Sequence, residues 1–158
     1  MSNLASRRRE LLQVGPARID VIVEGEGEGE AIVLLPSSLR DSEDFDLLAE
    51  LLALEGFQVL RPQPRGMGCS SPPPPGMTLD TLAADVAGVI VQMATGPAVV
   101  VGHAYGHWIA RVTDLRHPHR VRAVVVLGAA AHQFPPGMAE ALAVASDPLR
   151  PEEERLAA

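Results

Sequence analysis

The chain has 158 residues, enough for one domain with a buried core and too few for two domains of typical length. Its 20 acidic and 13 basic residues give a formal net charge of −7, which disfavours nucleic acid and anionic membranes as partners. Because no stretch has the apolar run of a secretory signal or a membrane span, we expect a cytoplasmic protein with no membrane partner.

The N-terminal part is expected to form a hairpin after a flexible start. Residues 1–9 include the basic run Arg7 to Arg9, which is typical of a solvated tail. Two β-prone runs follow, Leu11 to Val14 and Ala17 to Val23, with Gly15-Pro16 between them. This arrangement predicts two antiparallel strands joined by a tight turn.

Beyond the hairpin, apolar strands alternate with amphipathic helices. The predicted strands are residues 31–35, 57–60, 98–101 and 121–127. The predicted helices are residues 42–54, 79–93 and 106–116. Right-handed crossovers between such elements build a parallel sheet with helices on both faces, so the expected fold class is α/β.

The rest of the chain is expected to be loop or short helix. The Pro- and Gly-rich segment Pro62 to Pro75 predicts a long surface loop. After a turn at Gln133 to Gly137, Met138 to Ala145 has the spacing of one amphipathic helix. We expect residues 147–158 to be flexible and residues 1–158 to form a single domain.

Ligands of parallel α/β sheets bind where the strands end at their carboxyl edge. Four segments follow predicted strands and are therefore the candidate site: residues 36–38, 65–70, 103–105 and 129–132. Cys69 is the single cysteine, and the histidines have no spacing that suits zinc or iron. We accordingly expect no internal disulfide, no metal and no cofactor.

Three segments carry a resemblance to a known family. They are Leu34-Leu35-Pro36-Ser37-Ser38, Arg65-Gly66-Met67-Gly68-Cys69-Ser70 and Gly102-His103-Ala104-Tyr105-Gly106. In this order, each after a predicted strand, they resemble the oxyanion loop, the R-G-x-G-x-S loop and the G-x-S-x-G nucleophile elbow of the α/β-hydrolase family. The resemblance implies the N-terminal part of an esterase-like or lipase-like fold, truncated after about six strands.

The departures from the family pattern bear on function. Ala104 stands where the family has its nucleophilic serine, and a methyl group has no lone pair with which to attack a carbonyl. Gln63 takes the place of the aspartate in the family's D-x-R-G loop. The acid and the histidine that the family places after its seventh and eighth strands have no counterpart in this chain. What remains are two candidate oxyanion-hole donors, the backbone N–H groups of Ser38 and Tyr105.

Several side chains near this edge are candidates for the lining of a pocket. They are Ser37, Arg65, Cys69, His103 and His132. The family often has a histidine at the position of His103 for packing, so we expect a structural role there.

The two acidic residues of the helix 79–93, Asp80 and Asp85, lie five positions apart, share no helix face and are expected to be solvated.

Two kinds of function follow from these observations. The first is a hydrolase relative acting on esters or amides that is inactive or weakly active, a pseudoenzyme, because Ala104 is inert. The alternative is a non-catalytic binding or regulatory protein whose small ligand carries a carbonyl or carboxylate group, or a fragment of a longer hydrolase. The family's strand order also implies an uncovered edge at Ala123 to Leu127, where a second copy or a partner chain would pair.

Overall fold

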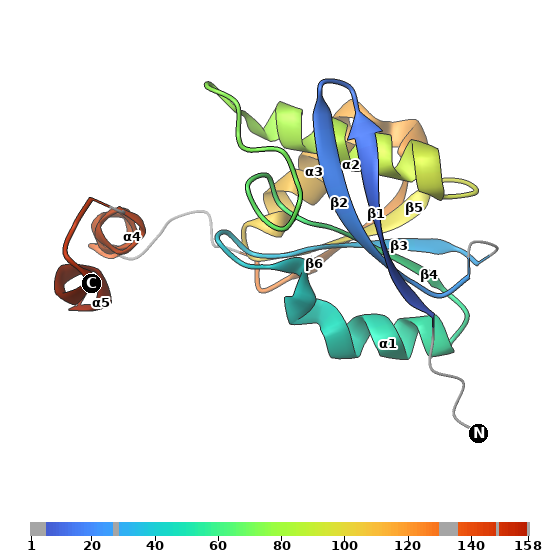
Figure 1. Cartoon of the computed structure of the whole chain (residues 1–158), viewed down its shortest axis with the longest axis horizontal. Coiled ribbons are helices and arrows are strands. Elements are labelled where there is room, and N and C mark those ends of the chain that lie inside the picture. Colours follow the sequence, from blue (N-terminus) through green and yellow to red (C-terminus); the bar gives the residue numbers. More distant parts are fainter. Residues whose placement is uncertain (1–5, 27–28, 130–135, 148, 158) are drawn as a thin grey trace.

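The computed structural model describes residues 6–26, 29–129, 136–147 and 149–157. Within these residues, six strands form one sheet in the order β1-β2-β4-β3-β5-β6 (Figure 1). The strands are β1 (Arg7–Val14), β2 (Ala17–Glu24), β3 (Ala31–Leu35), β4 (Gln58–Pro62), β5 (Ala98–His103) and β6 (Val121–Leu127). β2 runs antiparallel to β1 and β4, and the other pairs are parallel. The expected α/β fold with a mostly parallel sheet is confirmed.

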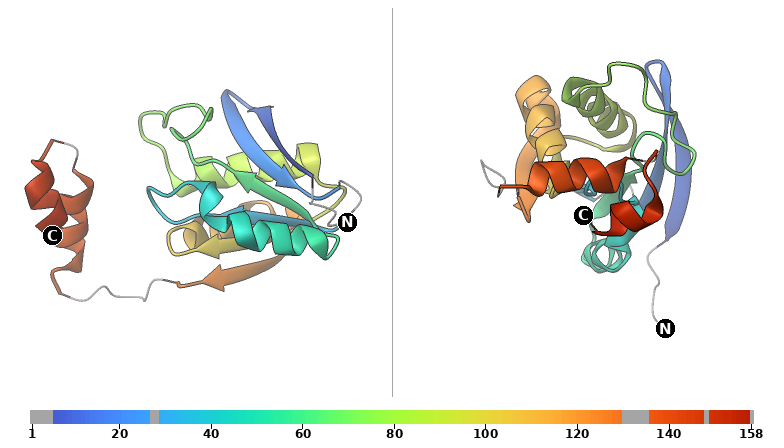
Figure 2. Two further views of the ribbon diagram at one scale, coloured as in Figure 1. Left: turned by 60° about the horizontal axis from the view of Figure 1, so that its bottom comes forward. Right: turned by 90° about the vertical axis from the view of Figure 1, so that its left-hand side faces the viewer.

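Helices cover both faces of the sheet. On one face, α2 (Leu79–Met93) and α3 (Gly106–Arg116) pack on the larger apolar core, and their contacts with the sheet include Val33 and Val100. On the other face, α1 (Asp46–Leu54) follows the 3-10 turn η1 (Ser42–Phe45) and covers a smaller core (Figure 2). A second 3-10 turn, η2 (Pro118–Arg120), leads into β6.

The basic run at the N-terminus is part of the sheet, contrary to expectation. β1 begins at Arg7, four residues before the predicted start, so residues 7–9 are not a tail. The Arg7 guanidinium donates hydrogen bonds to Asp46 and Glu43, each over 3.0 Å. These carboxylates come from α1 and η1. The order of charges along the sequence does not show that they lie close to Arg7 in the folded chain.

In the described part of the chain beyond β6, two helices are present. The predicted helix at Met138 is α4 (Met138–Ser146), whereas α5 (Glu152–Ala157) lies in the segment expected to be flexible. Figures 1 and 2 both show α4 beside α5, away from the sheet. No helix among the described residues is long and apolar enough to cross a membrane.

The position of β6 agrees with the expected uncovered edge. It pairs with β5 on one side, and it is the last strand in the order of the sheet. Val125 and Val126 are 41% and 42% exposed, although they alternate between the two faces of the strand. Pairing of this strand with a further chain stays a prediction.

Candidate active site

A sharp bend joins the central strand β5 to helix α3. Ala104 adopts a left-handed conformation with a φ of 45°, which L-residues other than glycine rarely adopt and which costs about 1–2 kcal/mol. Its amide donates to the carbonyl oxygen of Leu127 over 2.9 Å, and its carbonyl accepts from the amide of His107 over 3.0 Å. The tight bend expected between residues 102 and 106 is therefore present.

Both glycines of this bend are required by close backbone contacts. A Cβ at Gly102 would collide with the backbone of Gly106 and the Cα of His107. A Cβ at Gly106 would collide with the carbonyl oxygens of Leu35 and Pro36, at the end of β3. The bend thus packs directly against the loop that follows β3.

That neighbouring loop contains a second strained residue. Leu39 has a φ of 57°, and together with Ala104 it makes up the positive-φ residues other than glycine in the described part of the chain. The register pairs Leu35 with Gly102, so the loops after β3 and β5 lie side by side. Residues held in sparsely populated backbone conformations cluster at binding and active sites.

The third segment, residues 63–71, is fastened to β2. The amide of Cys69 donates to Asp20 Oδ2 over 3.0 Å, and the Ser70 hydroxyl donates to the Gln63 carbonyl oxygen over 2.9 Å. The Asp20 amide in turn donates to Ser70 Oγ over 3.0 Å. These bonds hold the expected surface loop in one conformation.

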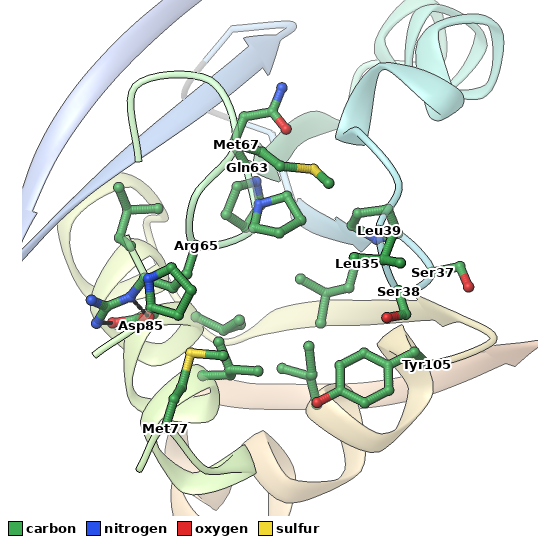
Figure 3. A pocket seen from close by; sticks show the side chains of 18 residues that line it. Leu35, Ser37, Ser38, Leu39, Gln63, Arg65, Met67, Met77, Asp85 and Tyr105 are labelled. Atoms are coloured by element: carbon green, nitrogen blue, oxygen red, sulfur yellow. Dashed lines mark hydrogen bonds and ion pairs between the residues drawn. The ribbon is translucent and has the colours of Figure 1, made fainter. Parts of the chain in front are cut away.

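A mostly apolar cavity of about 270 Å³ lies between these loops and helices α2 and α3 (Figure 3). It is just below the roughly 300–1,000 Å³ of typical small-molecule sites, so it suits a small ligand. The structure brings four of the predicted site residues to its wall: Ser37, Ser38, Arg65 and Tyr105. Figure 3 shows Ser38 and Tyr105 close together on one side.

Other predicted residues lie elsewhere. Cys69 is exposed, and neither it nor His103 is among the described residues that line the cavity. His103 is exposed, and its ring meets Phe45 edge-on with 6.5 Å between ring centroids, so its packing role stays a prediction. Ala104 neighbours the cavity through Tyr105 but does not line it. His132 falls outside the described residues.

Asp85 is a site residue that the sequence did not reveal. Its carboxylate accepts two hydrogen bonds from Arg65, at 2.7 Å to Nε and 2.8 Å to Nη2. The side chains of Arg65 and Asp85 are only 8% and 10% exposed, so the expectation of a solvated Asp85 is wrong. The hydrogen bonds to Asp85 raise the pKa of Arg65 despite the burial of its side chain. Asp80 is exposed and pairs with Arg116.

Gln63 connects the cavity to the start of η1. Its Oε1 accepts from the Ser42 amide over 3.2 Å, and its Nε2 donates to Asp41 Oδ1 over 2.7 Å. The side chain is buried and belongs to the cavity wall. The neutral amide of Gln63 therefore fixes the loop after β3. The sequence pointed to this residue because it takes the place of the aspartate in the D-x-R-G loop.

Comparisons with known proteins agree with this geometry. The family model described as "alpha/beta hydrolase fold" matches residues 30–154. The sn-1-specific diacylglycerol lipase ABHD11 of Danio rerio is 30% identical over 107 residues, which cover 67% of this chain and 33% of that protein. Epoxide hydrolase A of Mycobacterium tuberculosis is 31% identical over 134 residues, covering 82% and 42%.

Solved structures are similar over more of the chain. The crystal structure of Cfl2 from Burkholderia cenocepacia superposes with a TM-score of 0.77 at 25% identity, covering 96% of this chain and 55% of that one. A 2-hydroxy-6-oxo-6-phenylhexa-2,4-dienoate hydrolase from Rhodococcus superposes with a TM-score of 0.77 at 22% identity, covering 91% and 55%. The chain spans about a third to less than half of the two curated relatives above.

Proposed function

Because the chain belongs to the α/β-hydrolase fold family, we propose that Ala104 occupies the position of the family's nucleophilic serine and that the cavity binds a small ligand without cleaving it. One observation carries this proposal. The left-handed bend at Ala104 places Tyr105 on the wall of a mostly apolar cavity, beside Ser38.

The chemistry of residue 104 argues against acyl-enzyme formation. A methyl group offers no lone pair to a carbonyl carbon and no proton to a base. In subtilisin, removal of the nucleophile lowers turnover about 10⁶-fold, or roughly 8 kcal/mol of barrier. What remains in subtilisin comes from the oxyanion hole and from substrate binding, neither of which needs the nucleophile, so we expect this chain to bind a ligand and to turn it over slowly at most.

The ligand is expected to carry a carbonyl or carboxylate group on a short apolar body. Backbone N–H groups at Ser38 and Tyr105 are the proposed donors to its oxygen, because two fixed backbone donors on one side of a cavity can both bind a single acyl oxygen. The apolar wall favours an alkyl chain as the rest of the ligand, because burying that chain against residues such as Leu82 and Ile109 removes apolar surface from water.

A pair of matched ligands tests the proposal. Methyl hexanoate carries a carbonyl, whereas hexyl methyl ether has a similar length and none, so only the ester should raise the Tm in a concentration-dependent manner. Met77→Trp, which fills the cavity, should abolish the shift, whereas Met138→Trp, on α4, should keep it. Equal shifts with both ligands, or none with either, contradict the proposal.

Hydrolysis of esters or amides is the second candidate function. The retained glycines and the strained bend at Ala104 favour it, because they are the backbone features that a nucleophile at this position needs. An assay with chromogenic short-chain esters tests it on the chain and on Ala104→Ser. Rates equal to buffer for both proteins exclude this activity.

A further inference from the structure

The cavity wall contains one cation and one anion. Among the described lining residues, Arg65 and Asp85 are the ones that carry a formal charge at neutral pH. They come from different elements, Arg65 from the loop after β4 and Asp85 from the inward face of α2. Any effect of charge on the choice of ligand therefore depends on how these two side chains interact.

The two side chains neutralise each other. Asp85 engages the Nε and Nη2 edge of the guanidinium with both oxygens, at 2.7 and 2.8 Å, which is the bidentate geometry of strong ion pairs. Each side chain is about nine-tenths buried, so water screens the pair poorly. An unpaired arginine in this place would attract a carboxylate, but the pair presents no net charge.

The pair and the proposed oxyanion donors occupy different sides of the cavity. Figure 3 shows Arg65 and Asp85 together on one side, and Ser38 and Tyr105 on the other. A ligand whose carbonyl oxygen lies at Ser38 and Tyr105 would therefore extend its far end toward the ion pair. A charged group at that end would lose its hydration and find its partner already engaged.

We propose that the Arg65–Asp85 pair makes the cavity select ligands with an uncharged far end, so that monofunctional acyl compounds bind and dicarboxylic ones are rejected. The inference rests on the proposed binding function and defines its ligand class. Asp85 is in this view a specificity-determining residue, because it cancels a cation that would otherwise recruit a second carboxylate.

Calorimetric titration with two matched esters tests this selectivity. Methyl hexanoate and monomethyl adipate share their ester and chain length, and only the second ends in a carboxylate. The chain should bind methyl hexanoate at least tenfold more tightly, a difference of about 1.4 kcal/mol. Asp85→Asn should reverse the preference, because it frees the guanidinium. Asp80→Asn makes the same change at the exposed end of α2 and should leave the ratio unaltered.

A variant of Arg65, the other member of the pair, tests the selectivity independently if Asp85→Asn does not fold. Arg65→Met leaves Asp85 as the unpaired charge and should favour the cationic methyl 6-aminohexanoate over methyl hexanoate. An unchanged order of affinities in both variants overturns the inference and leaves the binding function standing. Failure of all three esters to bind the unaltered chain overturns the binding function itself.

Discussion

The backbone amide of Ala104 donates a hydrogen bond to the carbonyl oxygen of Leu127, 2.9 Å away. The strained bend after β5 is therefore attached to the last residue of β6, the open edge of the sheet.

Replacing Ala104 by glycine should stabilise the protein. The φ of 45° is unfavourable for alanine and free of strain for glycine, and the gain exceeds the extra entropy of the unfolded chain. We expect an increase of up to about 1 kcal/mol in the free energy of unfolding, measured by urea denaturation. Ala84→Gly is the matched control, because Ala84 is exposed in the interior of α2, where glycine should destabilise by about 0.5–1 kcal/mol. Loss of stability in both variants would show that the bend is not strained.

Adding a methyl group at Gly106 should disrupt the site. Its Cβ would overlap the carbonyl oxygens of Leu35 and Pro36, and backbone atoms cannot move aside as a flexible side chain does. We expect Gly106→Ala to lower the free energy of unfolding by more than about 3 kcal/mol, or to prevent folding. Gly96→Ala serves as the control, since a Cβ there meets nothing within 4 Å. Circular dichroism and thermal melts of the two variants distinguish them, and equal Tm values would contradict the close contact.

Stability should fall in acid through Asp46. Burial raises the pKa of this carboxyl, but hydrogen bonds from Arg61 and Arg7 outweigh that effect and hold it below the ordinary value of 3.8. The pKa of Asp46 is lower in the folded than in the unfolded protein. Ionised Asp46 therefore contributes its full stabilisation above the unfolded-state pKa, and this stabilisation is lost as the pH falls through the folded-state pKa. Between about pH 5 and pH 3 the Tm should therefore fall more steeply in the unaltered protein than in Asp46→Asn. Parallel curves for the two proteins would contradict this, and Asp114→Asn, on the exposed side of α3, controls for loss of a charge.

The chain should self-associate through β6. An edge strand with unpaired backbone groups and exposed valines is a template for a further strand, and charged side chains oppose such pairing. We expect the mass measured by light scattering to rise with concentration, and Val125→Lys to reduce that rise. Val91→Lys places the same charge on an exposed position of α2 and should not. A monomer at all concentrations refutes the prediction.

The order of the elements and the bend were predictable from local patterns. The short runs of apolar residues at β3 and β5 are typical of strands buried on both faces, and glycine at 102 and 106 marked the turn between β5 and α3. Membership of the family followed from the same segments, because their order along the chain is a property of the sequence alone.

Charge pairing was decided by the tertiary structure. Arg65 and Asp85 are 20 positions apart, and Arg7 lies 39 positions from Asp46. Nothing in the spacing indicates that these side chains meet, because the meeting depends on strand order and on the path of the loops. For the same reason, Cys69 was predicted to line the pocket, whereas it is exposed on the loop that Asp20 holds.

By itself, the sequence determined which segments form strands and helices, that alanine stands at position 104, and that the backbone turns sharply there, since these depend on the chemistry of neighbouring residues. Only the tertiary structure decided the cavity, the ion pair in its wall and the ends of the sheet. A cavity is the space left between distant elements, and an ion pair needs two charges a few ångströms apart, so both exist only once the chain has folded.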